Sequence, residues 1–272
     1  FGQVSVLRHL FHMYGIVSSL YKEAMKKTQQ PTYIYGKHAV SEALLGVPQA
    51  IKKVFLTKQT SGGELRAKVD TLGIPVALFD GGNMPRGVDP EAVHQGVIAE
   101  VLPEKLTRNY KSWIDELDVT NDTALVILGE VQDPHNVGAV IRSAAGFGAS
   151  AVLLPEHNQA PITGTVVKVS AGMAFTIPLV QIGNINAVVK DLKDRGFWIY
   201  GLEAESKQSI TDEQFDRPTV FILGNESRCI REKTREHCDI LLSIPLDPEC
   251  ESLNAAASAS VALYEWKRQR EK

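Results

Sequence analysis

The sequence has few cysteines, and their arrangement excludes two kinds of stabilising centre. It contains three cysteines among 272 residues, Cys229, Cys238 and Cys250, and an odd, sparse set is typical of a reducing cytoplasm, not of a disulfide framework. His237 lies among them, but no Cys-x-x-Cys spacing accompanies it, so no zinc site is expected. We therefore expect a cytoplasmic protein that carries neither disulfides nor a metal.

Long hydrophobic runs and a strong excess of charge are also missing. No apolar run approaches the roughly 20 residues that a membrane-spanning helix needs, so no membrane partner is expected. The formal net charge is −3, which does not by itself indicate a nucleic-acid-binding protein; any contact with RNA has to come from local basic patches. The length of 272 residues exceeds the usual size of one domain and predicts two.

Two glycine-rich phosphate-binding signatures are absent as well. A dinucleotide-binding fold carries Gly-x-Gly-x-x-Gly after its first strand, and no expected strand end in this chain supplies it. The Gly-Lys-Ser/Thr loop of ATP-binding and GTP-binding proteins is missing too. Chemistry based on NAD or ATP is therefore disfavoured.

The residue pattern divides the chain into four segments. Residues 1–30 combine apolar positions at helical spacing with basic side chains, and we predict an N-terminal extension; a targeting peptide, an RNA-contacting arm and a helix packed on the body remain alternatives. Residues 31–102 alternate helical and strand patterns and predict a small α/β domain. Residues 103–122 have mixed charge with a short helical pattern and predict a linker. Residues 123–272 predict a second α/β domain.

The expected elements of the two α/β domains follow from hydrophobic periodicity and turn residues. In the small domain we predict helices at 39–45, 64–72 and 90–93, and strands at 51–57, 74–79 and 96–101. In the large domain we predict strands at 124–128, 151–154, 177–180, 197–202, 220–223 and 240–244, and helices at 136–148, 165–171, 185–195, 226–238 and 252–268. Asn136 and Ser252 are the expected N-caps of two of these helices. The continuous apolar strands indicate a parallel sheet with right-handed crossovers.

Three places carry groups that suit chemistry. Arg142 interrupts the apolar pattern of the helix after the first strand; its guanidinium would suit a phosphate or a developing oxyanion, or it lies on the solvent side of the helix. Gly224-Asn225-Glu226 follows a strand, where glycine permits close backbone approach and the Glu226 carboxylate could orient a substrate, although such turns are common.

The third place lies in the last loops of the chain. Ile244, Leu246 and Leu253 combine exposed backbone groups with aliphatic side chains, which suits the edge and the faces of an adenine. The Ala/Ser-rich residues 255–260 would let another segment or subunit approach closely, or they simply form a buried helix.

Together, these places resemble the three ordered signature motifs of the SpoU (TrmH) family, the SPOUT-class RNA ribose 2′-O-methyltransferases. The motifs are Asn136-x5-Arg142, Gly224-Asn225-Glu226, and Ile244-Pro245-Leu246 followed by Ser252-Leu253-Asn254. The likeness covers about residues 33–268 and includes Ile34-Tyr35-Gly36 and His94-Gln95-Gly96. It is strongest to the branch that methylates a guanosine ribose of bacterial large-subunit rRNA.

The resemblance implies an α/β fold with a C-terminal SPOUT domain, a parallel sheet and a trefoil knot. A small ribosomal-protein-like α/β domain that captures RNA would precede it, and the enzyme would bind S-adenosylmethionine as a homodimer. By position, the cofactor contacts fall on Leu223, Gly224, Asn225, Ile244, Leu246, Ser252, Leu253 and Asn254. Arg142 becomes the residue that activates the ribose hydroxyl, with Asn136 and Glu226 organising the site.

The chemical role of Arg142 follows from its charge. A guanidinium with a pKa above about 12 resists acting as a general base. We therefore expect Arg142 to position the hydroxyl and stabilise the emerging alkoxide, while a phosphate or water takes the proton.

The sequence departs from the family in two loops where glycine is usual. Cys229 lies in the stretch after Gly-Asn-Glu, and Pro248 lies in the loop before Ser-Leu-Asn, so both loops are expected to be narrower or stiffer. An active rRNA methyltransferase is the leading interpretation. The alternatives are a tRNA ribose methyltransferase, a catalytically weak RNA-binding or ribosome-assembly relative, and a nucleotide-binding enzyme that does not act on RNA.

Overall fold

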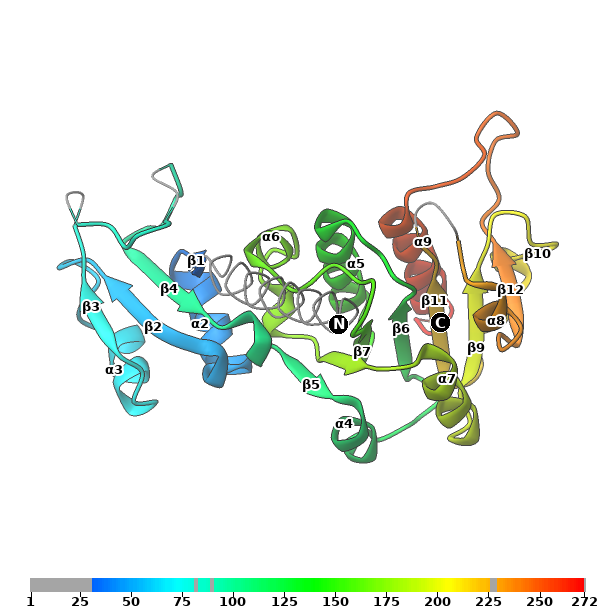
Figure 1. Cartoon of the computed structure of the whole chain (residues 1–272), viewed down its shortest axis with the longest axis horizontal. Helices are drawn as coiled ribbons and strands as arrows, with labels where there is room; N and C mark the ends of the chain where they lie inside the picture. Colours follow the sequence, from blue (N-terminus) through cyan, green and yellow to red (C-terminus); the bar gives the residue numbers. More distant parts are fainter. Residues whose placement is uncertain (1–30, 81–82, 89–90, 226–228, 272) are drawn as a thin grey trace, which may run out of the picture.

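Two α/β units lie next to each other along the long axis of the molecule (Figure 1). The computed structural model describes residues 31–80, 83–88, 91–225 and 229–271. The extension expected at residues 1–30 and the candidate residue Glu226 lie outside these ranges. The first unit is built on a four-stranded sheet and the second on an eight-stranded sheet.

The small unit has the strand order β1-β4-β2-β3. Its elements are β1 (Thr32–Tyr35), α2 (Lys37–Gly46), β2 (Ile51–Leu56), α3 (Glu64–Thr71), β3 (Val76–Leu78) and β4 (Val97–Val101). The helices α2 and α3 and the strands β2, β3 and β4 match those expected from the sequence, whereas β1 was not predicted and the helix expected at 90–93 is not found in the described residues. Residues 91–94 form a turn and irregular backbone, because so few residues cannot offset the cost of nucleating a helix.

The segment expected as a linker, 103–122, is partly built into the large sheet. Its strand β5 (Thr107–Asn109) pairs in parallel with β8 (Leu179–Ile182). The helix α4 (Tyr110–Glu116) then buries Trp113 and Ile114 in the core of the large unit. The linker prediction was wrong for this part, because a three-residue strand is too short to show a hydrophobic period.

The large sheet is parallel throughout, with the order β10-β12-β9-β11-β6-β7-β8-β5. Its further strands are β6 (Ala124–Leu128), β7 (Ala151–Pro155), β9 (Trp198–Leu202), β10 (Gln208–Ser209), β11 (Thr219–Leu223) and β12 (Ile240–Ser243). Every residue of β6, β7 and β11 is buried. This is the reason why these strands are continuous apolar runs, and the expected parallel sheet is confirmed.

Helices cover both faces of the large sheet. On one face, α5 (Pro134–Phe147), α6 (Gly164–Val169) and α9 (Ala255–Arg268) share a core with Val126 of β6. On the other face, α4 and α7 (Ile185–Asp194) pack with Leu125 and Ile127. Successive side chains of β6 thus pack into the hydrophobic layers on opposite faces of the sheet, as strand geometry requires.

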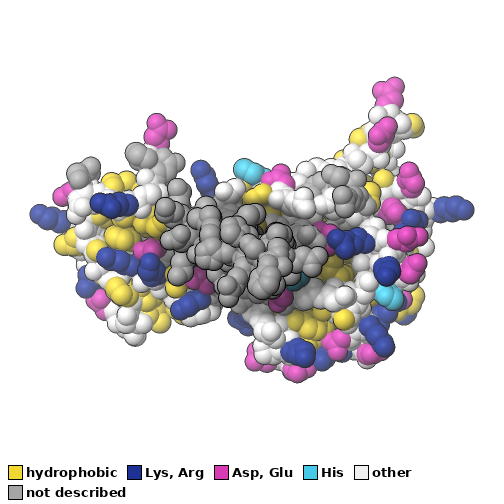
Figure 2. Space-filling model, in the orientation of Figure 1, with side chains coloured by type: hydrophobic (Ala, Val, Ile, Leu, Met, Phe, Trp, Pro, Cys, Tyr) yellow, Lys and Arg dark blue, Asp and Glu magenta, His cyan; other side chains and the backbone are white. Residues whose placement is uncertain are grey.

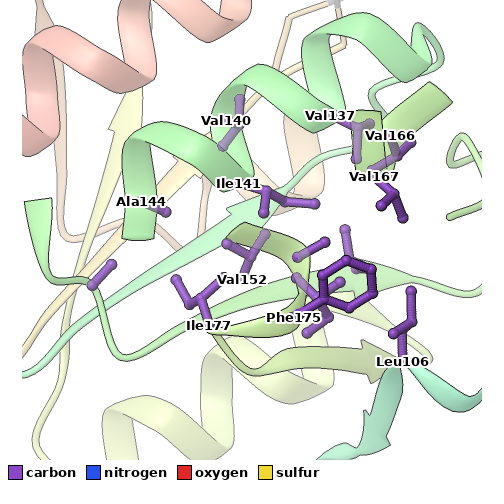
Figure 3. Packing of buried hydrophobic residues seen from close by; sticks show 14 of the residues in the cluster. Leu106, Val137, Val140, Ile141, Ala144, Val152, Val166, Val167, Phe175 and Ile177 are labelled. Carbon is purple, nitrogen blue, oxygen red and sulfur yellow. The ribbon is translucent and has the colours of Figure 1, made fainter. Parts of the chain in front are cut away.

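The core under α5 continues into the small unit. In Figure 3, Val140, Ile141 and Ala144 of α5 lie above Val152, with Phe175 and Leu106 further along the same layer. This cluster also contains buried residues of the small unit, from Ile34 to Val101. The two units therefore pack on one another through a shared hydrophobic cluster.

Three helix boundaries differ from those expected. Asp133, not Asn136, caps α5, because Pro134 occupies the first helical position and the Asp133 side chain accepts from His135 N. Asn254, not Ser252, caps α9 by accepting from Ala256 N. Of the charged helix expected at 226–238, the described residues form only the short helix α8 (Glu232–Arg235). No helix in these described ranges is long and apolar enough to cross a membrane.

Candidate functional site

The ends of three neighbouring strands define the site. β9 lies between β11 and β12, and all three run parallel, so their carboxyl ends meet at one edge of the sheet. Figure 1 shows the loop after β12 leaving this edge, extending away from the body and returning to α9. Ligands of open parallel α/β sheets bind at such an edge.

A cavity of about 120 Å³ lies between these strand ends. It is lined by Leu202, Glu203, Ala204, Leu223, Gly224, Asn225, Cys229, Leu242, Ile244, Leu246, Ser252, Leu253, Ala255 and Ser258. Seven of the eight residues expected to contact the cofactor are among them; Asn254 is the eighth. The fold therefore brings together residues from two loops that are separated in the sequence.

The lining suits an adenosine-like ligand. Leu223, Ile244, Leu246 and Leu253 supply aliphatic surface, and the adjoining loops supply backbone groups. The cavity is smaller than the roughly 300 Å³ at which pockets for small molecules begin. Residues 247–252, in the loop beside the cavity, are exposed.

Gly224 permits a very tight turn at the cavity. Asn225 N donates to Cys229 O at 3.1 Å, and Cys229 N donates to Asn225 O at 2.9 Å. A Cβ atom on Gly224 would lie 2.2 Å from the Cys229 carbonyl carbon and 2.4 Å from Ile230 N. The Asn225 side chain donates to Glu130 O at 2.8 Å and ties the turn to the loop after β6. Glu226 lies outside the described residues.

Cys229 adopts a conformation that favours glycine. Its φ is +54°, in the left-handed region that costs an ordinary residue about 1–2 kcal/mol. The family pattern led us to expect glycine in this stretch. The turn thus keeps a glycine-like backbone while carrying a side chain that lines the cavity.

Asn136 and Asn254 join the first and third motifs. Asn254 Nδ2 donates to Asn136 Oδ1 at 2.8 Å, while Asn254 Oδ1 accepts from Ala256 N at 2.8 Å and caps α9. Asn136 is buried in the first turn of α5. The Asn254 side chain therefore caps α9 and also orients the side-chain amide of Asn136, a candidate catalytic residue.

Asn254→Ala should lower the free energy of unfolding by about 1 kcal/mol through loss of the N-cap. It should also lower methylation, because the Asn136 amide loses the hydrogen bond from Asn254. Asn184→Ala is the matched control, since Asn184 caps α7 by accepting from Ala187 N at 3.1 Å. Urea denaturation and a methylation assay should show equal destabilisation in both variants, with reduced activity only for Asn254→Ala. Equal activity loss in both would assign the effect to stability.

Arg142 does not reach the cavity. It is exposed on the solvent side of α5, and it forms no ion pair with any residue that the structure describes. It lies about 9 Å along the helix from Asn136, at about 1.5 Å per residue. The site therefore has two parts: a partly open cavity at the strand ends and an exposed cation on α5.

Helices α5 and α9 lie parallel, one beside the other. About two turns after the Asn136–Asn254 bond, Ser143 Oγ lies 2.7 Å from Ser260 Oγ, and one turn further on the rings of Phe147 and Tyr264 meet edge-on. Small side chains at 255–260 allow this close approach, as the sequence suggested.

Sequence reasoning missed several lining residues, of which Glu203 is the most informative. It follows β9 directly, and 13% of its side chain is exposed. Arg235 Nε lies 3.2 Å from Glu203 Oε2, yet Oε2 has no hydrogen-bond partner. We read this contact as an ion pair with poor hydrogen-bond alignment. Its place at a strand end was the available signal.

Some basic residues of the small unit face solvent, and others form hydrogen bonds or ion pairs within the same unit. Lys37, His38 and Lys58 are exposed. Lys52 pairs with Glu100 at 2.6 Å, and His94 Nδ1 accepts from Gly96 N at 3.0 Å. On the face in Figure 2, lysine and arginine side chains are spread over this unit without forming one continuous patch.

The fold and the cavity define a class of protein. A parallel sheet covered by helices on both faces, with a cavity of aliphatic side chains and loop backbone at its strand ends, is the architecture of an α/β protein that binds a ligand at the carboxyl edge of its sheet.

Comparison with known proteins identifies the family. Residues 123–264 match the SpoU rRNA Methylase family, and residues 33–106 match the family described as RNA 2′-O ribose methyltransferase substrate binding. This chain belongs to the SpoU rRNA methylase family and is an RNA 2′-O-ribose methyltransferase. S-adenosylmethionine is the methyl donor of this class.

Individual relatives match both units. The chain is 36% identical over 243 residues to the 23S rRNA (guanosine-2′-O-)-methyltransferase RlmB of Pseudomonas putida, covering 88% of this chain and 96% of the relative. It is 35% identical to the same enzyme of Haemophilus influenzae, covering 87% and 97%. The SpoU methyltransferase AviRb of Streptomyces viridochromogenes, solved with AdoMet, superposes with a TM-score of 0.72 at 24% identity, covering 88% and 90%. This last likeness establishes the fold.

Proposed function

We propose that this protein methylates the ribose 2′-hydroxyl of a guanosine in large-subunit rRNA. The observation that carries the proposal is the convergence of residues from Leu223 to Leu253 on one cavity. Relatives that match across both units carry the name of this activity. The three free cysteines fit a reducing compartment, and we place the reaction in the cytoplasm.

Different residues would bind the methyl donor and act on the ribose hydroxyl. Gly224, Ile244 and Leu246 would hold the adenosine portion of the donor, while Arg142 faces solvent, where RNA approaches. An O–CH₃ bond forms as an S–CH₃ bond breaks, and the hydroxyl proton passes to water or a phosphate oxygen. The fixed charge of Arg142 would stabilise the alkoxide as this proton leaves, and Asn136 and Glu226 would position the hydroxyl.

We also propose that the chain end is knotted. Strand β12 lies beyond β9 in the sheet, yet α9 returns across the sheet to α5. At the end of α9, Gln269 bonds the segment before β11: its Nε2 donates to Glu213 O at 2.9 Å, and its Oε1 accepts from Phe215 N at 3.0 Å. Passage of α9 inside the loop between β9 and β11 would account for these contacts.

A second copy of the chain would complete the site. Val261 and Tyr264 on α9 are 37% and 55% exposed, next to Phe147 at the end of α5. This apolar surface supports a homodimer that packs through α5 and α9, close to the helix that carries Arg142. The small unit, which we take to be ribosomal-protein-like, would capture the rRNA.

Labelling of the cysteine thiols tests whether the cofactor binds in the cavity. Cys229 and Cys250 are exposed, whereas burial raises the pKa of Cys238 to about 12, so iodoacetamide at pH 8 should label only the first two. Because Cys229 lines the cavity, S-adenosylhomocysteine at 100 times its Kd should slow labelling of Cys229 by up to about a hundredfold. Peptide mass spectrometry measures each rate. Undiminished labelling of Cys229 would place the cofactor elsewhere; free N-acetylcysteine added to the same reaction, whose labelling the ligand does not affect, is the control for loss of reagent.

The reaction itself is tested in cells. A strain that lacks this gene should lose one ribose methylation, at a guanosine of large-subunit rRNA, and the wild-type gene should restore it. Ribose-methylation mapping of rRNA and tRNA measures both outcomes together. Loss of a tRNA methylation alone would overturn the rRNA assignment, and no loss would favour a role in RNA binding without catalysis.

A further inference from the structure

Glu203 occupies the position between the two loops of the cavity. The sheet register pairs Ile222 with Gly201 on one side and Leu242 with Leu202 on the other. Glu203 is the residue after Leu202, so continuing the register places it opposite Gly224 on one side and opposite Ser243, the last residue of β12, on the other. Glu203 N donates to Leu242 O at 3.0 Å. A ligand that touches both loops therefore passes over Glu203.

The Glu203 carboxylate has capacity for hydrogen bonds that the protein does not use. Oε2 is buried near Arg235, and no hydrogen bond to either carboxylate oxygen is formed by the residues described. An ionised carboxylate accepts about four hydrogen bonds, and polar groups with little exposure are normally satisfied. Oε2 is shielded beside Arg235, but the side chain lines the cavity and is 13% exposed, so donors from a bound ligand can reach the other oxygen, Oε1.

The donors that would reach Glu203 belong to the central part of the methyl donor, between its adenine and its methyl group. If the aliphatic loop residues hold the adenine and the methyl group faces the RNA, the ribose lies between them, above Glu203. Ribose hydroxyls are donors that the accessible oxygen of this carboxylate can accept, and nucleotide-binding folds use an acidic residue in this way. We propose that Glu203 binds the ribose hydroxyls of the donor's adenosyl group, an assignment that rests on the proposed function.

Calorimetry with two ligands tests this assignment. S-adenosylhomocysteine and 5′-methylthioadenosine share the ribose, but only the first carries the amino-acid ammonium. Glu203→Gln should weaken both by the same factor, about tenfold to a hundredfold, as expected for hydrogen bonds to a charged group. Glu203→Asp, which retracts the carboxylate, should lie in between. Arg235→Gln removes the ion pair but keeps the carboxylate and should bind both ligands as the wild type does.

A second ligand pair isolates the hydroxyls. The wild type should bind 2′-deoxy-5′-methylthioadenosine more weakly than 5′-methylthioadenosine, and Glu203→Gln should reduce this difference, as coupled groups require. A loss in Glu203→Gln confined to S-adenosylhomocysteine would assign Glu203 to the ammonium and overturn the proposal. Unchanged affinity in Glu203→Gln would overturn it too. Absence of binding by the wild type would overturn the proposed function and this assignment together.

Discussion

Replacing Arg142 with alanine should lower kcat for RNA methylation by about 10²–10³-fold. On the proposed mechanism, the change removes a fixed positive charge from the place where the 2′-oxygen would become negative, and losing one such group typically has an effect of this size. A methylation assay with saturating donor and RNA measures kcat directly. Binding of S-adenosylhomocysteine should be unchanged, because Arg142 does not line the cavity.

The stability of Arg142→Ala should also match the wild type. Arg142 is exposed, and substitutions at such sites usually change the free energy of unfolding by less than about 0.5 kcal/mol. Lys190→Ala is a matched control, since it removes one exposed charge from α7 on the opposite face of the sheet. Reduced kcat in both variants would indicate a general effect of surface charge on turnover, not a role at the hydroxyl.

Arg142→Lys separates charge from geometry. Lysine keeps the positive charge but loses the planar fork that holds two oxygens at once, so its kcat should lie between those of the wild type and the alanine variant. Full methylation by the lysine variant, with donor binding retained, would remove the guanidinium from the chemistry.

The large sheet could be predicted from the sequence because its central strands are buried on both faces. The runs at Ala124–Leu128 and Thr219–Leu223 are fully buried, and burial on both faces leaves an unbroken apolar pattern. Strand β5 (Thr107–Asn109) was missed for the opposite reason. Its three polar residues join the sheet through backbone pairing with β8, which leaves no trace in side-chain periodicity.

Part of the candidate site could be predicted because a tight backbone turn requires a particular residue type in the sequence. Gly224 is required by a turn that admits no Cβ atom, and a glycine after a strand indicates such a turn. Asn254 and Asn136 were singled out through the family motif, but their hydrogen bond depends on the parallel packing of α5 and α9. Glu203 was missed because its importance comes from sheet register, since β9 runs between β11 and β12.

The Gly224→Ala variant should lose both stability and donor binding. The added Cβ would lie 2.2 Å from the Cys229 carbonyl carbon, whereas ordinary contact begins at 3.4 Å. The turn from Asn225 to Cys229 therefore has to open by more than 1 Å. Forcing extra volume into a packed site costs about 1–3 kcal/mol, and a displacement of about 1 Å at a reactive site lowers the rate about 10²-fold.

Gly183→Ala is the matched control for this change. Gly183 also follows a strand of the large sheet directly, but a Cβ atom there meets nothing within 4 Å. Urea denaturation and calorimetry with S-adenosylhomocysteine should therefore show a normal protein for Gly183→Ala and a weakened one for Gly224→Ala. If Gly224→Ala lost stability but bound the ligand normally, the turn would be structural only, and the donor would have to be held by the loop after β12. If both properties stayed normal, the turn would open without cost, and the tight closure at Cys229 would have no part in binding the donor.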